Sequence, residues 1–494
     1  MFSQLHAPLV QALHNCGLRQ DHAAFYAPGH KRGQGVSSLH RRVFGDDIFR
    51  VDVPELPELD DLFAPESVIL AAQQLAAEAF GAEQTWFLVN GSTCGVEAAL
   101  LATCGPGDQV LVPRNAHQSV LSGLILSGAM PVWMAPVYDP DWQLALGMTA
   151  SAIAATLRQH PAAKAVVVVS PTYEGVCSDI AAIAEVVHGY DLPLIVDAAH
   201  GPHFAFHDQL PPSALSGGAD IVIHSAHKVL AAFTQAALIH VQGSRCDRTR
   251  LGMALRMTQS SSPSYLLLGS LDAARHQMVN EGEKLMEHTL ALAHSARCQL
   301  RDSGLSVLDV SEDGFGLHGA RFQQDYTRLT VDVSALGITG FAADAWLHGW
   351  GVTAELPTLD QLTFIVSLGN SVQDIERLVQ GLRHLVNQLG QLPARGAVVD
   401  HGDWSQVDVG LPGAGMSPRE AFFASTATCA VEDAIGRLSA DVVCIYPPGI
   451  PQLMPGEPIT QRVIHTLKMA QAAGAHLSGL ADPTLQTLRI LQPG

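Results

Sequence analysis

Short, continuously apolar segments alternate with amphipathic segments over the first two thirds of the chain. The apolar segments predict strands, and the amphipathic segments between them predict helices. Strands of this kind are typical of a mostly parallel sheet that is covered by helices on both faces. The strands predicted for this α/β core span 85–90, 109–113, 131–137, 163–171, 192–199 and 219–225.

The pattern differs on either side of this core. The first residues predict a helix followed by an irregular arm, and a long helical pattern near 264–296 leads to segments typical of an α+β layer. A third region predicts a helix over 417–439, a strand near 442–449 and a helix over 459–474. We therefore predict an arm at 1–65, a large α/β domain at 66–290, a small α+β domain at 291–394 and a C-terminal domain at 395–494.

Composition and charge narrow the class of protein. The 28 Lys and Arg residues against 47 Asp and Glu residues give a formal net charge of −19, which disfavours nucleic acid as a partner. The longest apolar runs, such as 165–169, are far shorter than the ~20 residues that cross a bilayer. The N-terminus has no secretory pattern, and the eight cysteines form no C-x-x-C pair. We expect a cytoplasmic protein with reduced thiols, no metal site and no membrane association.

Polar residues follow three of the predicted strands. Lys228 ends the segment ADIVIHSAHK, and Asp197 ends the strand in LPLIVDAAHG, thirty-one residues earlier. Upstream, the strand TWFLVN leads into Gly91, Ser92 and Thr93 at the start of a helix. Each of these features is common by itself, and a single lysine is usually a surface residue. Because open α/β sheets bind ligands at the carboxyl ends of their strands, the three together predict a site.

Pyridoxal phosphate requires these groups. A lysine amine condenses with its aldehyde, a carboxylate keeps its ring nitrogen protonated, and a helix N-terminus accepts its phosphate. These roles fall to Lys228, Asp197 and the turn at Gly91–Thr93. Ser225 and His227, which flank Ala226 beside Lys228, can donate hydrogen bonds to the phosphate. His117, after the strand at 109–113, is a candidate for stacking on the ring.

The chain resembles the fold-type I ornithine/lysine/arginine decarboxylases, an aspartate-aminotransferase-like fold. The resemblance implies a homodimer with the active site at the subunit boundary, where Ser260 and Ser261 would approach the partner's phosphate. It also implies the cofactor roles given above, with His117 on the ring and Ser92, Thr93, Ser225 and His227 around the phosphate. The similar segments are FYAPGHKRG, ELPELDDLF, FLVNGSTCG, RNAHQSVLSGLILSGA, SPTYEGV, VDAAHGPHF, HSAHKVLAAFTQ, SSSPSYLLLGSLDAAR, SPREAFFA and YPPGIPQLMPGE.

Three departures from the family pattern are visible. The chain is too short for the additional N-terminal domain of the large acid-induced members, so it resembles the short form. Many members have a tryptophan three residues after the aspartate, where this chain has His200. We include His200 among the cofactor-binding and catalytic candidates. Cys94 occupies a position in the phosphate turn where other members often have a smaller residue.

The resemblance implies decarboxylation of a basic amino acid in polyamine biosynthesis. Arginine, converted to agmatine, is preferred over lysine or ornithine because short members with YPPGIP resemble biosynthetic arginine decarboxylases. Either His227 or Lys228 could return the proton to Cα. Glu355 is the first candidate for the carboxylate that binds the distal cation of the substrate, and Asp360 is the second. The alternatives are another fold-type I enzyme, either an aminotransferase or a lyase, and a non-catalytic pyridoxal-phosphate-binding regulator.

Overall fold

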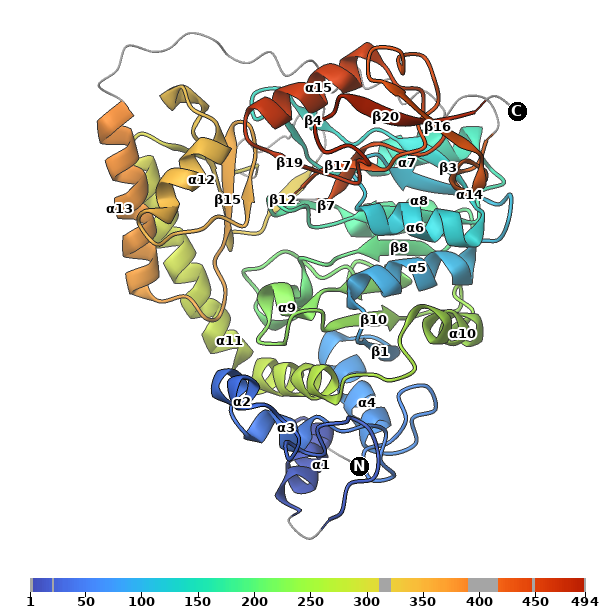
Figure 1. Ribbon diagram of the computed structural model, residues 1–494, viewed down its shortest axis with the longest axis vertical. Coiled ribbons are helices and arrows are strands. Elements are labelled where there is room, and N and C mark those ends of the chain that lie inside the picture. Colours follow the sequence, from blue (N-terminus) through green and yellow to red (C-terminus); the bar gives the residue numbers. More distant parts are fainter. Residues whose placement is uncertain (1–2, 20–21, 311–320, 390–415, 447–448, 493–494) are drawn as a thin grey trace. The chain divides into compact units, whose positions relative to one another are not determined.

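The computed structural model describes residues 3–19, 22–310, 321–389, 416–446 and 449–492 (Figure 1). The chain divides into two compact units. Unit 1 contains 1–102 and 196–286, and unit 2 contains 103–195 and 287–494. The domain boundaries predicted from the sequence stay a prediction, and the boundary between residues 394 and 395 lies outside the described residues.

The sheet of unit 1 is built around a strand that the sequence analysis did not predict. β10 (Ala237–Val241) pairs antiparallel with β1 (Gln84–Leu88) on one side and with β9 (Ile221–His224) on the other. β8 (Leu194–Asp197), whose last two residues belong to unit 1, follows β9 in the strand order. Every residue of β8, β9 and β10 is buried, so these strands form the core of the unit.

Unit 2 contains the parallel strands that the sequence predicts. β2 (Gln109–Pro113) pairs parallel with both β3 (Met130–Met134) and β6 (Ala165–Val169). The prediction of an α/β fold with mostly parallel strands is therefore confirmed, with β10 adding antiparallel pairs to the sheet. The helices along this part of the chain are α6 (Gln118–Ser127), α7 (Ala150–Gln159) and α8 (Ile180–His188).

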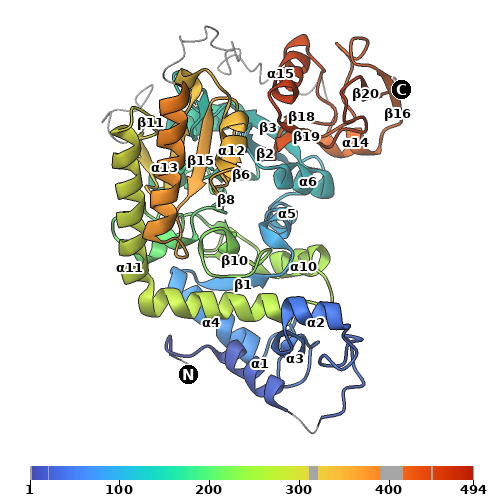
Figure 2. The same cartoon turned by 60° about the vertical axis from the view of Figure 1, so that its left-hand side comes forward.

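The rest of unit 2 forms smaller layers. The antiparallel strands β11 (Ser306–Val307), β13 (Arg328–Asp332), β15 (Gln361–Ile365) and β14 (Leu356–Pro357) form a four-stranded sheet in that order. Figure 2 shows α12 (Gly340–His348) and α13 (Val372–Leu389) in front of β15, and these helices bury an apolar core against the sheet. The short strands elsewhere in unit 2 are β4 (Tyr138–Asp139), β5 (Leu144–Ala145), β7 (Val176–Ser178) and β12 (Phe322–Gln324).

The helix predicted over 417–439 is wrong. α14 (Pro418–Phe423) ends after six residues, and β16 (Thr426–Ala430) begins within the predicted helix and pairs with β20 (Thr487–Leu491). Thr426 and Thr428 are β-branched, which favours a strand wherever a pairing partner is present. The other elements of this region are β17 (Val443–Tyr446), β18 (Ile450–Leu453), α15 (Gln461–Ala472) and β19 (His476–Ser478).

In the N-terminal part of unit 1, Asp60 caps α4 (Val68–Phe80). Its carboxylate accepts hydrogen bonds from the backbone N–H groups of Glu66, Ser67 and Ile69. Burial raises the pKa of Asp60, but backbone hydrogen bonds, those of Glu66 and Ser67 first among them, together lower it below its ordinary value. The segment ELPELDDLF therefore has a structural role in starting this helix. The other helices of unit 1 are α1 (Pro8–Leu18), α2 (Ser38–Phe44), α3 (Asp47–Val51), α5 (Gly91–Thr103), the short α9 (Ala226–Val229), α10 (Arg248–Thr258) and the first part of α11 (Tyr265–Arg301).

A buried ion pair on α11 holds the N-terminus of α1 through hydrogen bonds to its backbone. Asp272 accepts hydrogen bonds from the backbone N–H groups of Leu9 and Val10, at 3.0 and 3.4 Å, and so caps the N-terminus of α1. Its other oxygen binds the guanidinium of Arg275, which donates in turn to the carbonyl of His6 at 2.6 Å. Both side chains are almost completely buried, so each charge depends on the other.

We expect Asp272→Ala to lower the free energy of unfolding by about 3 to 5 kcal/mol, because it leaves Arg275 buried without its carboxylate. Denaturant unfolding followed by circular dichroism measures this change. Glu283→Ala, an exposed position on the same helix, is the control and should change stability by less than about 0.5 kcal/mol. Equal stability of the two variants would show that the ion pair does not support α1.

Candidate active site

The pairing of β10 brings two of the predicted site segments to the same edge of the sheet. Leu88, the last residue of β1, lies opposite Ala237, and His224, the last residue of β9, lies opposite Leu238. Since β10 runs antiparallel to both strands, the carboxyl ends of β1 and β9 meet at its amino end. The turn at 89–92 and the segment 225–228 therefore leave the sheet side by side.

The turn after β1 leads directly into the N-terminus of a helix. Gly91 has a φ of +76°, which an L side chain rarely adopts, and it begins the thirteen-residue helix α5. Gly95, one turn later, lies against β1 and β9, since a Cβ there would come within 2.8 Å of Leu88 and 3.2 Å of Ile223. The first turn of α5 can therefore direct its N–H groups outward, with Thr93 exposed.

A direct contact joins this turn to the segment after β9. The hydroxyl of Ser225 donates to the hydroxyl of Ser92 at 2.7 Å. Ser225 is completely buried. These two hydroxyls were predicted to face the same phosphate. The contact brings these two predicted phosphate ligands together.

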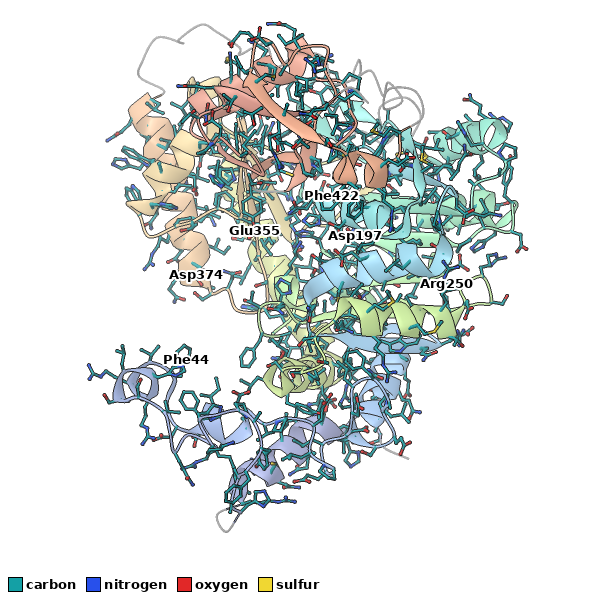
Figure 3. The ribbon with its side chains drawn as sticks, turned by 45° about the vertical axis from the view of Figure 1, so that its right-hand side comes forward. Phe44, Asp197, Arg250, Glu355, Asp374 and Phe422 are labelled. Atoms are coloured by element: carbon teal, nitrogen blue, oxygen red, sulfur yellow. The ribbon has the colours of Figure 1, made fainter. Side chains whose placement is uncertain are left out.

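Lys228 and Asp197 follow neighbouring strand ends. The backbone N–H of Ala198 donates to Ile223, and that of Ser225 donates to Ala199, so the chain after β8 runs beside the chain after β9. Asp197 is 6% exposed and accepts the N–H of Ala199 at 3.2 Å (Figure 3). The carboxylate therefore lies buried at the same edge of the sheet as Lys228.

His200 contacts the lysine directly. Its Nε2 atom lies 2.8 Å from Nζ of Lys228, and its side chain is 3% exposed. An imidazole at this position can accept a proton of the lysine ammonium, whereas the N–H of an indole can only donate. The departure from the family's tryptophan therefore adds a polar partner for the lysine.

His227 is held in one orientation. Its Nδ1 atom donates to the carbonyl of Ala236 at 3.1 Å, because a carbonyl can only accept. Burial lowers the pKa of His227, and the charge of Lys228 lowers it further, against the effect of the Ala236 carbonyl. The imidazole is consequently neutral near pH 7, with Nε2 as an acceptor.

Two buried histidines lie behind this edge. His224 Nδ1 is 3.1 Å from His240 Nε2, and the Nδ1 atom of His240 is 2.7 Å from the Thr85 hydroxyl. Burial lowers the pKa of His240 to about 3, and burial followed by the charges of His240 and His203 lowers that of His224 well below its ordinary value. This chain of three polar side chains links β1, β10 and β9 with neutral rings.

The sequence analysis missed the residues that clamp the turn. Val89 donates its N–H to Gln259 at 2.8 Å and accepts from the amide of Gln235 through its carbonyl. Gln235 has a φ of +86° and Asn90 accepts the N–H of Ser260. The similar segment HSAHKVLAAFTQ contains Gln235, but nothing in its periodicity distinguishes this residue.

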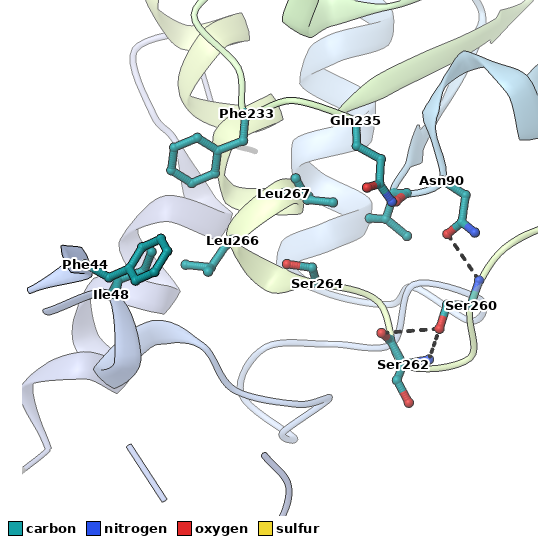
Figure 4. Close-up of a pocket in the computed structure, with 11 residues that line it drawn as sticks. Phe44, Ile48, Asn90, Phe233, Gln235, Ser260, Ser262, Ser264, Leu266 and Leu267 are labelled. Carbon is teal, nitrogen blue, oxygen red and sulfur yellow. Dashed lines mark hydrogen bonds between the residues drawn. The ribbon is translucent and has the colours of Figure 1, made fainter. Parts of the chain in front are cut away.

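These residues border a cavity of about 600 Å³ in unit 1 (Figure 4). Its polar side carries Asn90, Gln235 and Ser260, and its apolar side carries Phe44 and Phe233, both more than half exposed. The remaining lining residues are Ile48, Val89, Ser262, Ser264, Leu266 and Leu267. Ser260 and Ser261 are exposed beside this cavity.

Cys94 is a packing residue in this geometry. Its side chain is 2% exposed, and its thiol donates to the carbonyl of Gly91 at 3.1 Å. Burial raises the pKa of the thiol to about 12. A thiol in this state is neither a nucleophile nor an access-controlling group at neutral pH.

His117 lies in unit 2 as the N-cap of α6. Its Nδ1 atom accepts the N–H of Ser119 at 3.2 Å and lies 2.9 Å from the Ser119 hydroxyl. A neutral imidazole that accepts at Nδ1 carries its hydrogen on Nε2. The ring is therefore fixed at one edge by the start of its own helix.

Glu355 and Asp360 also lie in unit 2, on either side of β14. Glu355 is exposed, and its backbone N–H donates to Thr363 of β15. Asp360 is partly buried in the turn between β14 and β15, and its carbonyl accepts the N–H of Val333. The two carboxylates thus belong to opposite ends of a short hairpin, and Glu355 is the more accessible.

Arg328 lies close to Glu355. Its guanidinium is completely buried, donates to the Thr327 hydroxyl at 2.9 Å and lies 3.6 Å from Asp325. Burial lowers the pKa of Arg328, while Asp325 and then Glu355 raise it. The sequence analysis did not identify Arg328. Its positive charge interacts with Glu355, the carboxylate predicted to bind the distal cation of the substrate.

Comparison with known families identifies the family to which this chain belongs. The family model "Orn/Lys/Arg decarboxylase, major domain" matches residues 7–313, and "Orn/Lys/Arg decarboxylase, C-terminal domain" matches residues 406–488. The chain belongs to the Orn/Lys/Arg decarboxylase family. It is an amino-acid decarboxylase that depends on pyridoxal phosphate, so the predicted activity class and cofactor are confirmed, and the aminotransferase and regulator alternatives are not supported.

Relatives within this family match the whole chain. An arginine decarboxylase of Bacillus subtilis is 36% identical over 491 residues, which cover 99% of each chain. The lysine decarboxylase LdcA of Pseudomonas aeruginosa is 30% identical, over 68% of this chain and 48% of its own length. A solved structure of the Francisella novicida lysine decarboxylase LdcF superposes with a TM-score of 0.83 at 20% identity, covering 99% of this chain and 81% of that one.

The residues of unit 1 fit the cofactor of this decarboxylase family. The open turn at Gly91 and the joined hydroxyls of Ser92 and Ser225 suit a phosphate, and the amine of Lys228 and the buried carboxylate of Asp197 suit an aldehyde and a protonated ring nitrogen. Within the described ranges, no group of three or more His, Cys, Asp or Glu side chains is arranged to hold a metal ion. A search of the same residues finds no helix both long and apolar enough to cross a membrane.

We expect the stability of the decarboxylase to fall as the pH is lowered from about 6.5 towards 3. An unfolded histidine takes up a proton near pH 6.5, whereas folded His240 does so only at about 3, so the unfolded state binds more protons in this window. Each such histidine contributes a slope of up to about 1.4 kcal/mol per pH unit. Urea unfolding at pH 7.5, 6.0 and 5.0 measures this slope.

His240→Gln should be less stable at pH 7.5 and should show a shallower slope than the wild type. His288→Gln, exposed on α11, is the control and should reproduce the wild-type slope. A slope in His240→Gln equal to that of the wild type would mean that other groups cause the loss in acid.

Proposed function

We propose that the protein decarboxylates L-arginine to agmatine and carbon dioxide, as a step towards polyamines. The observation that supports the chemistry is the meeting of Lys228, Asp197 and the Ser92–Ser225 pair at one edge of the sheet. The observation that supports arginine is the 36% identity to an arginine decarboxylase along nearly the full length of both chains, against 30% identity to the lysine decarboxylase LdcA.

Each residue of unit 1 has one task in this proposal. Pyridoxal phosphate, when bound, supplies an aldehyde and a ring that accepts the electrons released from Cα. The Lys228 amine binds the aldehyde, and His200 accepts a proton from that amine. Asp197 holds the proton of the ring nitrogen, while Ser92, Ser225 and the N–H groups of α5 bind the phosphate. Thr93 adds a hydroxyl on the exposed side of the same turn.

We assign the return of the proton to Cα to Lys228 rather than His227. Its lowered pKa leaves His227 neutral, with its Nδ1 hydrogen already engaged by the carbonyl of Ala236. A neutral imidazole in this orientation accepts at Nε2 and has no proton to deliver there. The Nζ atom of Lys228 lies 2.8 Å from Nε2 of His200, so a proton that His200 has accepted from the amine can return through Nζ.

Glu355 is the proposed partner of the substrate's distal cation. Its exposure leaves the carboxylate accessible to a substrate. Asp360 remains the second candidate, less accessible in its turn.

We also propose that the protein acts as a homodimer, in which Ser260 and Ser261 approach the partner's phosphate. Support comes from their exposure next to a cavity with the exposed apolar side chains Phe44 and Phe233. Exposed aromatic residues around a cavity are common where a second chain packs. The N–H of Ser260 is held by Asn90, and its hydroxyl accepts the N–H of Ser262 at 3.1 Å, so the turn that carries Ser260 and Ser261 is fixed beside the cavity.

We expect purified protein with pyridoxal phosphate to convert arginine to agmatine, with less product from lysine and ornithine. Mass spectrometry after separate incubations measures the products. Lys228→Ala should form no amine and lose the borohydride-reducible cofactor adduct, whereas Lys164→Ala, an exposed lysine, should retain both. A keto acid as the product, or an adduct on another lysine, would contradict the proposal.

We expect Glu355→Gln to lower kcat/KM for arginine about tenfold to a hundredfold, because a charge-assisted contact contributes roughly 1.5 to 3 kcal/mol. The absorbance of the bound cofactor should not change. Glu376→Gln removes a charge from the exposed face of α13 and serves as the control. Normal kinetics in Glu355→Gln would transfer the role to Asp360 or to the partner subunit, and a lost cofactor spectrum would show that Glu355 supports the site structurally.

A further inference from the structure

The segment YPPGIPQLMPGE near the C-terminus has no role in the chemistry described above. From Gly449 to Glu457 it lies in unit 2, where it contacts the loop that carries His117. Gln118, the next residue, donates its N–H to the carbonyl of Gly449 at 3.1 Å. The two segments are far apart in sequence. Cys444, which precedes the C-terminal segment, follows Gln118 by 326 positions.

Gly449 faces the imidazole edge that Ser119 leaves open. A Cβ on Gly449 would lie 3.3 Å from Nε2 and 3.4 Å from Cδ2 of His117, which is tighter than ordinary van der Waals contact. Gly449 also has a φ of +84°, a conformation that favours glycine. The backbone of the C-terminal segment can approach the ring this closely only because the residue has no side chain.

A second contact anchors the same segment. Arg114, three residues before His117, donates to the carbonyl of Pro451 at 2.7 Å and pairs with Glu457 at 3.2 Å. Glu457 also accepts the N–H of Met454 at 2.9 Å. Burial raises the pKa of Glu457 and Arg114 lowers it, so the carboxylate depends on this arginine for its charge.

Little free space remains between the ring and the residues that line one side of it. The gap lined by His117, Arg114, Trp133 and Pro451, together with Ala116, Val120, Leu121 and Met454, measures about 10 Å³. This is about the volume that one water molecule needs. The guanidinium of Arg114 also lies 5.7 Å from the centre of the Trp133 ring. A displaced imidazole would therefore have to move its neighbours.

We propose that Gly449, held in place by the Arg114–Glu457 pair, is a positioning residue that fixes the His117 ring for stacking on the cofactor. The proposal rests on the proposed decarboxylase function and on the stacking role that the sequence analysis predicts for His117. On one edge the ring is bound by Ser119, and on the other it is confined by the backbone at Gly449. In this proposal the C-terminal region contributes to cofactor binding through the backbone at Gly449.

Gly449→Ala tests this proposal, with Gly436→Ala as the matched control. Gly436 lies in the same region with a φ of +80°, but a Cβ there would meet nothing within 4 Å. Both variants carry the same backbone strain, and only the first presses on His117. The readout is the dissociation constant of pyridoxal phosphate, titrated into apoenzyme and followed by absorbance and circular dichroism of the bound cofactor.

We expect Gly449→Ala to weaken cofactor binding about threefold to tenfold relative to Gly436→Ala, since a shift of a few tenths of an ångström must be absorbed at the ring. Thermal unfolding of the two apoproteins should be alike. Equal dissociation constants for the two variants would overturn the proposal and leave the proposed decarboxylation unaffected.

A double-mutant cycle with His117→Ala separates positioning from general damage. If Gly449 acts through the imidazole, Gly449→Ala should have no further effect on cofactor binding once His117 is alanine. Additive effects of the two substitutions would overturn the proposal. Unchanged cofactor affinity in His117→Ala alone would overturn both the stacking role and this inference, whereas the identity of the reaction product is tested independently of either.

Discussion

The antiparallel insertion of β10 between β1 and β9 is the constraint on which the arrangement of the site depends. Through the backbone pairs Leu88–Ala237 and His224–Leu238, it brings the phosphate turn and the lysine segment to one edge of the sheet. The hydroxyl contact between Ser92 and Ser225, 133 residues apart in sequence, follows directly from this register. A slip of one residue would turn every side chain of a strand to the opposite face and separate these hydroxyls.

The same strand accounts for the buried polar side chains behind the site. β10 contributes His240, which bridges His224 and Thr85 on its two neighbours. A hydrogen-bonded chain of neutral rings satisfies groups that would otherwise be costly to bury. The edge of the sheet proposed to hold the cofactor is thus supported by a network whose stability is greatest at neutral pH, and the lysine itself is contacted by His200.

Two separate parts of the chain position the groups proposed to hold the cofactor. In unit 1 the turn at Gly91 is held by Gln235 and Gln259 through the backbone of Val89. In unit 2 the ring of His117 is held by Ser119 and confined by Gly449. In both cases side chains or backbone atoms that lie far away in sequence restrict a loop at the end of a strand, and such preorganisation is what a cofactor-dependent site requires.

Local sequence was sufficient to predict the alternating elements, the strand ends and the residue types that pyridoxal phosphate needs. Continuous apolar runs identify buried strands, and Lys228, Asp197 and Gly91 follow the ends of those runs, so a site at this edge of the sheet could be predicted from their positions and residue types. The helix over 417–439 failed because β16 gains its stability from β20, about sixty residues further on. Only the tertiary structure decided four other features. These are the pairing of β10, the orientation of His227, the charge interaction of Arg328 with Glu355, and the close approach of Gly449 to His117. Each of these depends on a pairing or a close approach between distant segments, which the periodicity of a single segment does not encode.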